Sequence, residues 1–367
     1  MKTDKKKRII LHIGALKTGS SAIQHFCASN FERLKNQGIY YPGSKSDHDI
    51  MERIAKGERR ANASFLKNRS YDKDRLNTIL TTFESDPDLH TMLLSEECLF
   101  LNIYKKTKIH PEAKETLQRF DTHVLVFLRR CTEYFAGTWQ ENIRAGGHKS
   151  FSSHIKNYDY VDCLENLYQL KQDFGHNKLH IELYNEPSIS DYNSVDVIFK
   201  YLRFESDDIK PSKARINTAV SRDFLESLGI VNKTLCCKLP SRYKKFIPSL
   251  SDQTVHESLS DTEIETIVNR CEPIEKRIAK DFFGREYLFE DSFPDHYMEA
   301  RDEYVSVSMN LKEKLFKPLI KIAFINIYFK KSKFIGWLVF SIITMLPTKY
   351  GQKLLKLLKK SNIIKGS

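Results

Sequence analysis

The start of this 367-residue chain constrains the fold more than any other segment. Ile9–Ile13 is a short apolar run that predicts a buried strand, and Gly14–Ser21, a loop of small and hydroxylated residues, follows it. Beyond the loop, apolar residues recur at the spacing of one helix face, and Gly38 then predicts the helix end: Ile23, Phe26, Phe31 and Leu34. A strand, a loop and a helix in this order begin a doubly wound α/β fold.

Three later segments predict further strands, namely Met92–Leu94, Val124–Leu128 and Lys178–Tyr184. The rest of the chain to about Phe293 has a mainly helical pattern, and the polar segment Asp47–Asp88 predicts no particular element. We therefore expect an α/β domain, residues 1–293, with a parallel central sheet flanked by helices. Residues 294–367 are expected to form a helical, basic C-terminal extension.

The positive charge of the chain is confined to its last part. The formal net charge is +12, and residues 311–367 contain thirteen lysines and a single acid, Glu313, so they carry all of it. A nucleic-acid enzyme more often carries its basic surface on the folded body, around the site. The distribution therefore favours partners other than nucleic acid.

Cysteine usage and the first residues indicate a cytoplasmic protein. The seven cysteines are odd in number, form no CxxC motif and form no cluster with histidine at zinc-ligand spacing. Free thiols in a reducing compartment and no bound metal are the expectation. The apolar run Ile9–Ile13 is too short for a signal peptide core or a membrane span.

The loop Gly14–Ser21 has the chemistry of a phosphate-binding turn. A strand-to-helix turn directs free backbone N–H groups and the positive end of the helix dipole at one point. Lys17 adds a cation, and Thr18, Ser20 and Ser21 add hydroxyl groups. The order of residues is not that of the nucleotide-kinase loop GxxxxGK[ST], because Lys17 precedes Gly19. An ordinary capped turn with a solvated lysine is the alternative.

The pattern His12-Ile13-Gly14-x-x-Lys17-Thr18-Gly19-Ser20-Ser21-x-x-Gln24 resembles a known loop. It is similar to the 5′-phosphosulfate loop of sulfotransferases that use 3′-phosphoadenosine 5′-phosphosulfate (PAPS), in particular the bacterial carbohydrate branch written HIGxxKTGTTSLQ. The resemblance implies a P-loop-like α/β fold and PAPS as the sulfuryl donor, without a metal. It also implies that Lys17 neutralises the bridging oxygen of the phosphosulfate, while Thr18, Gly19, Ser20 and Ser21 bind the nucleotide.

A second motif follows the predicted strand Val124–Leu128. Arg129 and Arg130 lie at the strand end, where a planar guanidinium suits a phosphate. The family carries a serine eight residues after such an arginine, to bind the 3′-phosphate. Eight residues after Arg129 lies Gly137, which has no hydroxyl, and eight after Arg130 lies Thr138. The resemblance implies a site of Arg129, Arg130 and Thr138, and the division of labour between the arginines stays open.

A catalytic base is expected near Ser95-Glu96-Glu97, after the strand Met92–Leu94. Bacterial relatives show Ser-Ser-Glu at this point, so Glu97 matches their carboxylate. Glu96 and His48, which follows a Tyr-Pro pair as a histidine does in relatives, are the alternative bases. A carboxylate can serve as a base when burial and geometry suit it. Arg215, in a loop late in the domain, is expected to close over the nucleotide.

The tail beyond residue 310 has the composition of an interfacial helix. Residues 334–346 form an apolar run of thirteen, shorter than the ~20 needed to span a bilayer. Further on, four lysines fall at helical spacing on one face: Lys349, Lys353, Lys356 and Lys360. A basic face and an apolar face indicate binding to an anionic membrane through residues 311–367, on the inner face of the cell membrane. Packing on the body or a dimer interface is the alternative.

Together these observations predict a PAPS-dependent sulfotransferase that acts on a hydroxyl of a cell-surface polysaccharide or its lipid-linked precursor. An ATP-dependent small-molecule kinase is one alternative, because the loop is directed at phosphate. A non-catalytic, membrane-associated binder of glycan or nucleotide is the other. The acceptor sugar and the oligomeric state stay open.

Overall fold

The computed structural model describes residues 6–43, 61–101, 108–158, 160–184, 193–205, 222–235 and 259–289. The chain divides into two compact units. The first contains Met1–Tyr134, Tyr158–Thr218 and Glu265–Ser292, and the second contains Phe135–Asn157, Ala219–Ile264 and Phe293–Ser367. The predicted extension, residues 294–367, lies outside the described residues.

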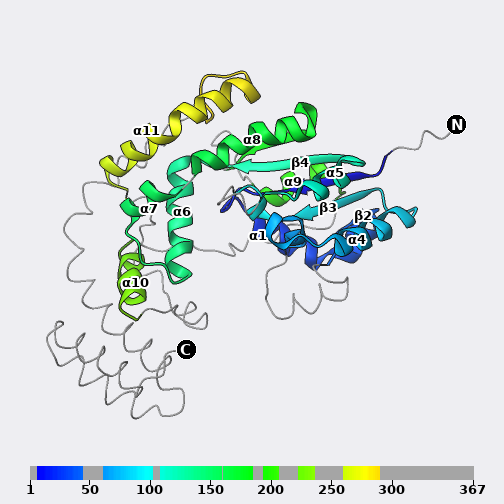
Figure 1. Ribbon diagram of the computed structural model, residues 1–367, viewed down its shortest axis with the longest axis horizontal. Helices are drawn as coiled ribbons and strands as arrows, with labels where there is room; N and C mark the ends of the chain where they lie inside the picture. Colours follow the sequence, from blue (N-terminus) through cyan, green and yellow to red (C-terminus); the bar gives the residue numbers. More distant parts are fainter. Residues whose placement is uncertain are drawn as a thin grey trace, which may run out of the picture. The chain divides into compact units, whose positions relative to one another are not determined.

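A five-stranded parallel sheet forms the centre of the first unit, in the order β2-β3-β1-β4-β5 (Figure 1). The strands are β1 (Arg8–His12), β2 (Ile39–Tyr40), β3 (Thr91–Ser95), β4 (Asp121–Leu128) and β5 (Leu179–Leu183). β1 is fully paired with β3 on one side and β4 on the other. The four strands predicted from the sequence are thereby confirmed, as is the parallel α/β fold. β2 has only two residues, too few for a recognisable pattern.

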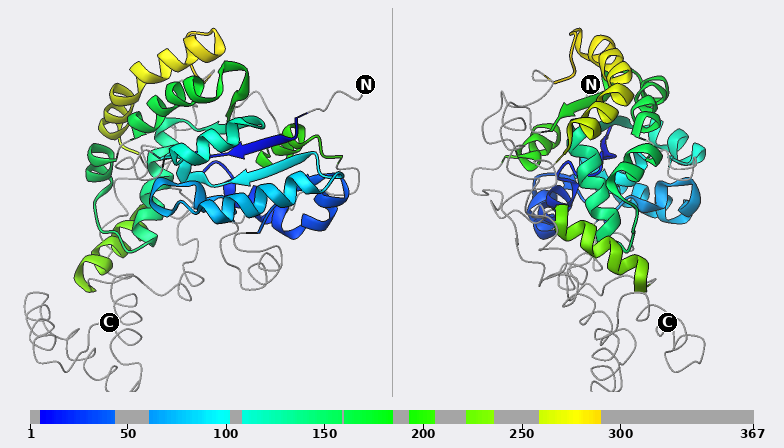
Figure 2. Two further views of the ribbon diagram at one scale, coloured as in Figure 1. Left: turned by 45° about the vertical axis from the view of Figure 1, so that its right-hand side comes forward. Right: turned by 90° about the vertical axis from the view of Figure 1, so that its left-hand side faces the viewer.

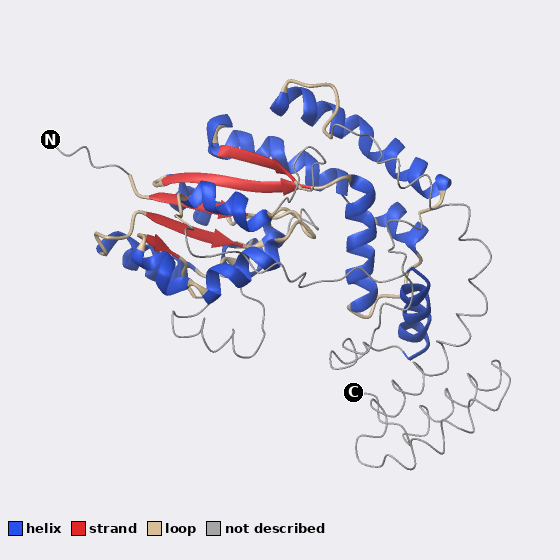
Figure 3. Cartoon of the chain, turned by 180° about the vertical axis from the view of Figure 1, so that it is seen from behind, coloured by secondary structure: helices blue, strands red, loops and turns tan. Residues whose placement is uncertain are grey.

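Helices lie on both sides of the sheet (Figures 1 and 3). On one face, the helices α1 (Ser20–Ser29), α2 (Phe31–Asn36) and α9 (Ser194–Leu202) form an apolar core with side chains of β1, β3 and β4. The helices α5 (Pro111–Gln118) and α8 (Tyr160–Phe174) also contact β4. A sheet buried by helices in this way explains why β1, β3 and β4 contain continuous apolar runs.

Two features of the first unit differ from the sequence interpretation. The helix expected to run unbroken to Gly38 is interrupted at Asn30, whose backbone N–H and side-chain amide both donate to the carbonyl of Phe26. The segment without an assignment contains α4 (Lys73–Ser85), capped by Asp72, which accepts from the N–H of Arg75 at 2.9 Å. Its buried residues have the spacing of one helix face: Leu76, Ile79, Leu80 and Phe83.

The strands point the same way, so their carboxyl ends meet at one edge of the sheet (Figure 3). The segments that follow β1, β3, β4 and β5 begin at Ile13, Glu96, Arg129 and Tyr184. In open α/β sheets, ligands bind outside the carboxyl ends of the strands. The predicted loop, base and arginines therefore share this edge.

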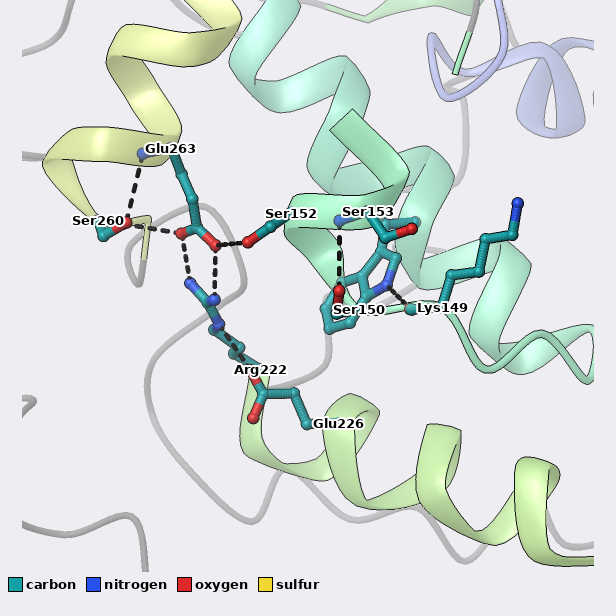
Figure 4. A network of polar contacts seen from close by, with 9 residues as sticks. Lys149, Ser150, Ser152, Ser153, Arg222, Glu226, Ser260 and Glu263 are labelled. Carbon is teal, nitrogen blue, oxygen red and sulfur yellow. Dashed lines mark hydrogen bonds and ion pairs between the residues drawn. The ribbon is translucent and has the colours of Figure 1, made fainter. Parts of the chain in front are cut away.

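The second unit contains α7 (Phe151–Asn157), α10 (Arg222–Leu235), most of α6 (Cys131–Arg144) and the start of α11 (Asp261–Ile278). Arg222 donates through Nη1 and Nη2 to the two carboxylate oxygens of Glu263, each at 2.7 Å (Figure 4). Glu263 also accepts from the N–H of Ser260 and from the hydroxyl of Ser152. Burial raises the pKa of Glu263, but the hydrogen bonds of Arg222 and Ser260 outweigh it and hold the pKa below its ordinary value.

The remaining elements are short. They are the 3-10 helices Ser64–Leu66, Asn68–Ser70, Glu97–Leu99 and His176–Lys178 and the π-helical turn Ala279–Phe283. Figure 2 shows the ribbon from two further sides, with the colours of Figure 1. None of the helices in the described ranges combines the length and the apolar character that crossing a membrane requires.

Candidate phosphate-binding site

The loop between β1 and α1 holds a backbone conformation that its glycines make accessible. Gly14 and Gly19 have φ angles of 118° and 86°, which side-chain-bearing residues rarely adopt. A Cβ at Gly19 would lie 2.1 Å from Oγ of Ser194, and a Cβ at Gly14 would lie 2.7 Å from the carbonyl oxygen of Glu97. The loop is therefore packed against α9 and against the segment after β3, with no room for larger residues.

The amino end of α1 is open to an anion. Its N-cap, Gly19, provides no side-chain cap, and the first turn contains no acidic residue. The first N–H groups of a helix have no partner within the helix and carry a positive partial charge. The hydroxyls of Thr18 and Ser20 donate to the carbonyl of Ala15 at 2.7 and 3.4 Å, which holds the loop in shape, while Ser21 is exposed.

Lys17 lies in this loop with a φ of 65°, a left-handed conformation that costs free energy in a non-glycine residue. Nη1 of Arg129 donates to the carbonyl of Lys17 at 2.8 Å. Nε of Arg129 donates to Glu133 at 2.6 Å, and its guanidinium lies over the ring of Tyr184. Arg129 therefore connects the end of β4 to the loop and holds the backbone of Lys17.

Arg130 has different surroundings, although it is the next residue. It is 6% exposed, and its guanidinium lies 4.8 Å from the centre of the ring of Phe289. Burial raises the pKa of the nearby Glu275, and a hydrogen bond from Cys131 and the charge of Arg130 oppose that rise. The two arginines thus have separate environments, whereas the sequence could not distinguish between them.

Thr138 belongs to the second unit, on α6. It is buried, and its hydroxyl lies 3.1 Å from the carbonyl of Phe135 and 3.0 Å from Nε2 of His154. Burial lowers the pKa of His154 to about 4, so this imidazole is neutral at physiological pH. The role of Thr138 at a 3′-phosphate stays a prediction.

The two candidate carboxylates after β3 point to different partners. Glu96 pairs with Lys67 at 3.3 Å and accepts from the N–H of Cys98 at 3.1 Å. Glu97 is 6% exposed and accepts from the side-chain amide of Gln24 at 2.9 Å. An ion pair thus holds Glu96, and the role of Glu97 as the base stays a prediction. The third candidate, His48, and the loop residue Arg215 lie outside the described residues.

Glu96, Glu97 and Cys98 also bring three potential metal ligands within 4.8 Å of one another. Lys67 neutralises Glu96, and burial raises the pKa of the Cys98 thiol to about 12, so it is protonated. A metal bound here would have to displace the proton of Cys98 and compete with Lys67 for Glu96, because metals bind the thiolate.

Gln24 and His12 belong to the sequence motif, but the sequence assigned no role to either. Both are buried and lie within one cluster of hydrogen bonds with Ser95 and Glu97. Gln24 follows Ser20 by four residues, so it lies one turn further along α1 on the same face. That spacing is the signal that Gln24 lies on the same side of α1 as the loop, although it does not identify the residues after β3 as its partners.

A scan against models of protein families finds no match, and neither does a search of curated proteins. Among solved structures, the chain is similar to a sulfotransferase from Alicyclobacillus acidocaldarius, at 12% identity and a TM-score of 0.35, covering 57% of this chain and 85% of that one. It is also similar to a retinol dehydratase in complex with androsterone and the inactive cofactor PAP, at 10% identity and a TM-score of 0.32, covering 78% and 83%. At such identities and TM-scores, any function has to be argued from the residues of the site.

Proposed function

We propose that this protein transfers the sulfuryl group of PAPS to a hydroxyl group. The observation that carries the proposal is the loop Gly14–Ser21, in which an uncapped helix end, free of acids, lies beside a lysine whose backbone is held by an arginine. These features match the chemistry of a phosphosulfate, which is anionic and gains charge on its bridging oxygen during transfer. The sequence pattern of the loop supports the same donor.

PAPS supplies a sulfuryl group bonded through oxygen to a phosphate that can leave. Lys17 and the N–H groups at the start of α1 bind the phosphate side of this bond and stabilise the charge that develops there. Arg129 keeps the lysine in place through its carbonyl. Preorganised donors are effective because they need no rearrangement when the bond breaks.

Glu97 acts as the general base. It accepts the proton of the attacking hydroxyl as the oxygen of that hydroxyl bonds to sulfur and the bond from sulfur to the phosphate oxygen breaks. The products are a sulfate ester, a proton on Glu97 and 3′-phosphoadenosine 5′-phosphate (PAP). The backbone of Glu97 packs directly against Gly14 of the loop, and this closeness supports the role.

The 3′-phosphate is assigned to the arginines after β4 and to Thr138, on the strength of the sequence spacing. Within the described residues, Arg129 donates through Nε to Glu133 and through one hydrogen of Nη1 to Lys17, which leaves the other hydrogen of Nη1 and both hydrogens of Nη2 for a phosphate. Arg215 is proposed to cover the nucleotide. A hydroxyl of a polysaccharide or of a lipid-linked glycan is the proposed acceptor, in keeping with the bacterial carbohydrate branch that the loop resembles.

The basic tail, residues 311–367, is proposed to hold the enzyme on the inner membrane surface, where a lipid-linked acceptor would be within reach. Each lysine near an anionic leaflet contributes about 1 kcal/mol. We expect the full chain to sediment with phosphatidylglycerol vesicles and to be released by salt, because salt screens these charges. Replacing Lys349, Lys353, Lys356 and Lys360 with glutamate should abolish sedimentation. Equal sedimentation of both proteins, or binding to neutral phosphatidylcholine vesicles, would show that the tail has another purpose.

Titration with PAP and with ATP tests the proposed function. Both nucleotides carry adenine and a 5′-phosphate group, but only PAP carries a 3′-phosphate. A sulfotransferase binds PAP more tightly, whereas a kinase binds ATP more tightly.

A further inference from the structure

A buried cluster of hydrogen bonds connects α1 with the ends of β1 and β3. The side-chain amide nitrogen of Gln24 lies 2.9 Å from Oε2 of Glu97 and 3.1 Å from Oγ of Ser95. Oγ of Ser95 lies 2.9 Å from Nδ1 of His12. All four residues are less than 7% exposed. The cluster has four members, which come from β1, from α1, and from the end of β3 and the 3-10 helix that follows it.

The hydrogen positions in this cluster follow from what each group can donate. An ionised carboxylate only accepts, so the atom of Gln24 that faces Glu97 is the NH₂ group. Its two hydrogens go to Glu97 and to Oγ of Ser95. The hydroxyl hydrogen of Ser95 then goes to the other neighbour of Oγ within the described chain, Nδ1 of His12.

His12 is therefore a neutral imidazole with its proton on Nε2. Burial lowers the pKa of His12 to about 4, against the opposing charge of Glu97. Nδ1 is occupied as an acceptor, and Nε2 carries the proton and has no hydrogen-bond partner among the described residues. An imidazole in this state has no basic nitrogen to offer a substrate, so the cluster contains one candidate base, Glu97.

The backbone at Ser95 is also fixed. Its N–H donates to Oδ1 of Asn62 at 2.7 Å, and Nδ2 of Asn62 donates to the carbonyl of Leu93 at 3.0 Å. Ser95 is thus a rigid acceptor for one hydrogen of Gln24, and this sets the plane of the amide that faces Glu97. A group held on two sides has less freedom to lose when it orients a reacting partner.

We propose that Gln24 is a positioning residue, which holds Glu97 at a set distance from the phosphate-binding loop. Gln24 lies one turn after Ser20, the first residue of α1. One rigid helix therefore carries the loop at its amino end and the amide that orients the base on its second turn. This inference rests on the proposed function, because it assigns a role in proton removal during sulfuryl transfer.

The test compares Gln24→Met with the wild type in the release of PAP from PAPS, with water as the acceptor. Methionine keeps the length and volume of the side chain and removes the hydrogen bond. We expect kcat to fall on the order of 10- to 100-fold while the KM for PAPS and the affinity for PAP stay within about twofold. Asn166→Leu, which removes a buried amide from α8, is the matched control and should keep the wild-type rate.

The split between kcat and KM separates positioning from a merely structural role. Losing the hydrogen bond from Gln24 to Glu97 should lower kcat alone, because the phosphate-binding loop is unchanged. A distorted loop would instead raise the KM for PAPS and weaken the binding of PAP. A loss confined to KM and PAP affinity would overturn the proposal.

A second variant and a spectroscopic measurement test the proposal even if Gln24→Met fails to fold. Gln24→Glu keeps the shape but opposes Glu97 with a like charge, so it should lose more activity than Gln24→Met; an equal or smaller loss contradicts the proposal. Nitrogen NMR of histidine-labelled protein should show His12 with its proton on Nε2. A proton on Nδ1 would refute the hydrogen-bond assignment, whatever the reaction is.

Lys17→Ala, measured beside these variants, distinguishes a failure of the proposed function from a failure of the positioning role alone. If PAP release by Lys17→Ala and by Gln24→Met equals that of the wild type, the proposed function fails and the positioning role fails with it. If Lys17→Ala is inactive while Gln24→Met keeps its rate, the positioning role alone is wrong.

Discussion

Replacing Lys17 with alanine is expected to lower the turnover of PAPS by about 100- to 1,000-fold. Lys17 stands beside the amino end of α1, where, in the proposed reaction, charge develops on the phosphate oxygen as the sulfuryl group leaves. Removing one such donor typically costs about 3–4 kcal/mol of transition-state stabilisation. The measurement is PAP release from PAPS under saturating conditions. Lys35→Ala, at an exposed position on α2, is the control and should retain the wild-type rate.

The backbone conformation of Lys17 also predicts an effect on stability, which is opposite in sign to the effect on activity. Its φ of 65° is strained for lysine or alanine and relaxed for glycine. Lys17→Gly should therefore be as inactive as Lys17→Ala but more stable by about 1 kcal/mol, measured as the free energy of unfolding in urea. A protein that is both inactive and less stable would show that the lysine supports the fold. Near wild-type turnover would show that it takes no part in transfer.

Replacing Arg222 with leucine is expected to destabilise the second unit by about 3–5 kcal/mol. The side chains of Arg222 and Glu263 are 17% and 8% exposed, and their paired hydrogen bonds are both 2.7 Å long. Losing the arginine leaves a carboxylate buried with only the weaker contacts of Ser260 and Ser152, and breaking a buried pair in this way is costly. Figure 4 shows that the arginine is the shared neighbour of Glu263 and Glu226.

Trp139 is a suitable reporter, because it is buried in the second unit and its ring N–H donates to the carbonyl of Lys149. Its fluorescence is followed in urea, with Trp337, the other tryptophan, replaced by phenylalanine. Glu226→Gln is the control: this carboxylate is 31% exposed and four residues from Arg222, so its loss should cost below about 1 kcal/mol. Equal costs for both variants would mean that the Glu263 pair is no stronger than a surface pair.

The sequence was a sufficient guide to the sheet wherever a strand is apolar along most of its length. β1, β3 and β4 have that property because helices cover the sheet. β5 instead alternates leucine and isoleucine with polar residues, and β2 consists of Ile39 and Tyr40 alone. The break at Asn30 could not be foreseen, because the apolar spacing continues across it. α4 was missed although Asp72 and the spacing of Leu76 and Phe83 offered both a cap and an apolar face.

The candidate site was predictable only where its residues are neighbours in the chain. The loop around Lys17 is such a case, since strand, turn and helix follow directly. The contact of Arg129 with the carbonyl of Lys17 joins residues far apart in sequence, and so does that of Gln24 with Glu97. No residue spacing reveals these contacts, because the order of strands in the sheet decides which loops meet. The burial of Arg130 against Phe289 is hidden for the same reason.

The most direct test of the proposed PAPS site is the change in thermal stability on adding PAP and, separately, ATP. A ligand at about 100 times its dissociation constant stabilises the folded state by about 2.7 kcal/mol. A site with separate places for a 5′- and a 3′-phosphate should give that stabilisation with PAP at a concentration where ATP gives much less. Lys17→Ala should reduce the effect of PAP. Equal stabilisation by both nucleotides, or a larger effect of ATP, would contradict a PAPS-dependent sulfotransferase.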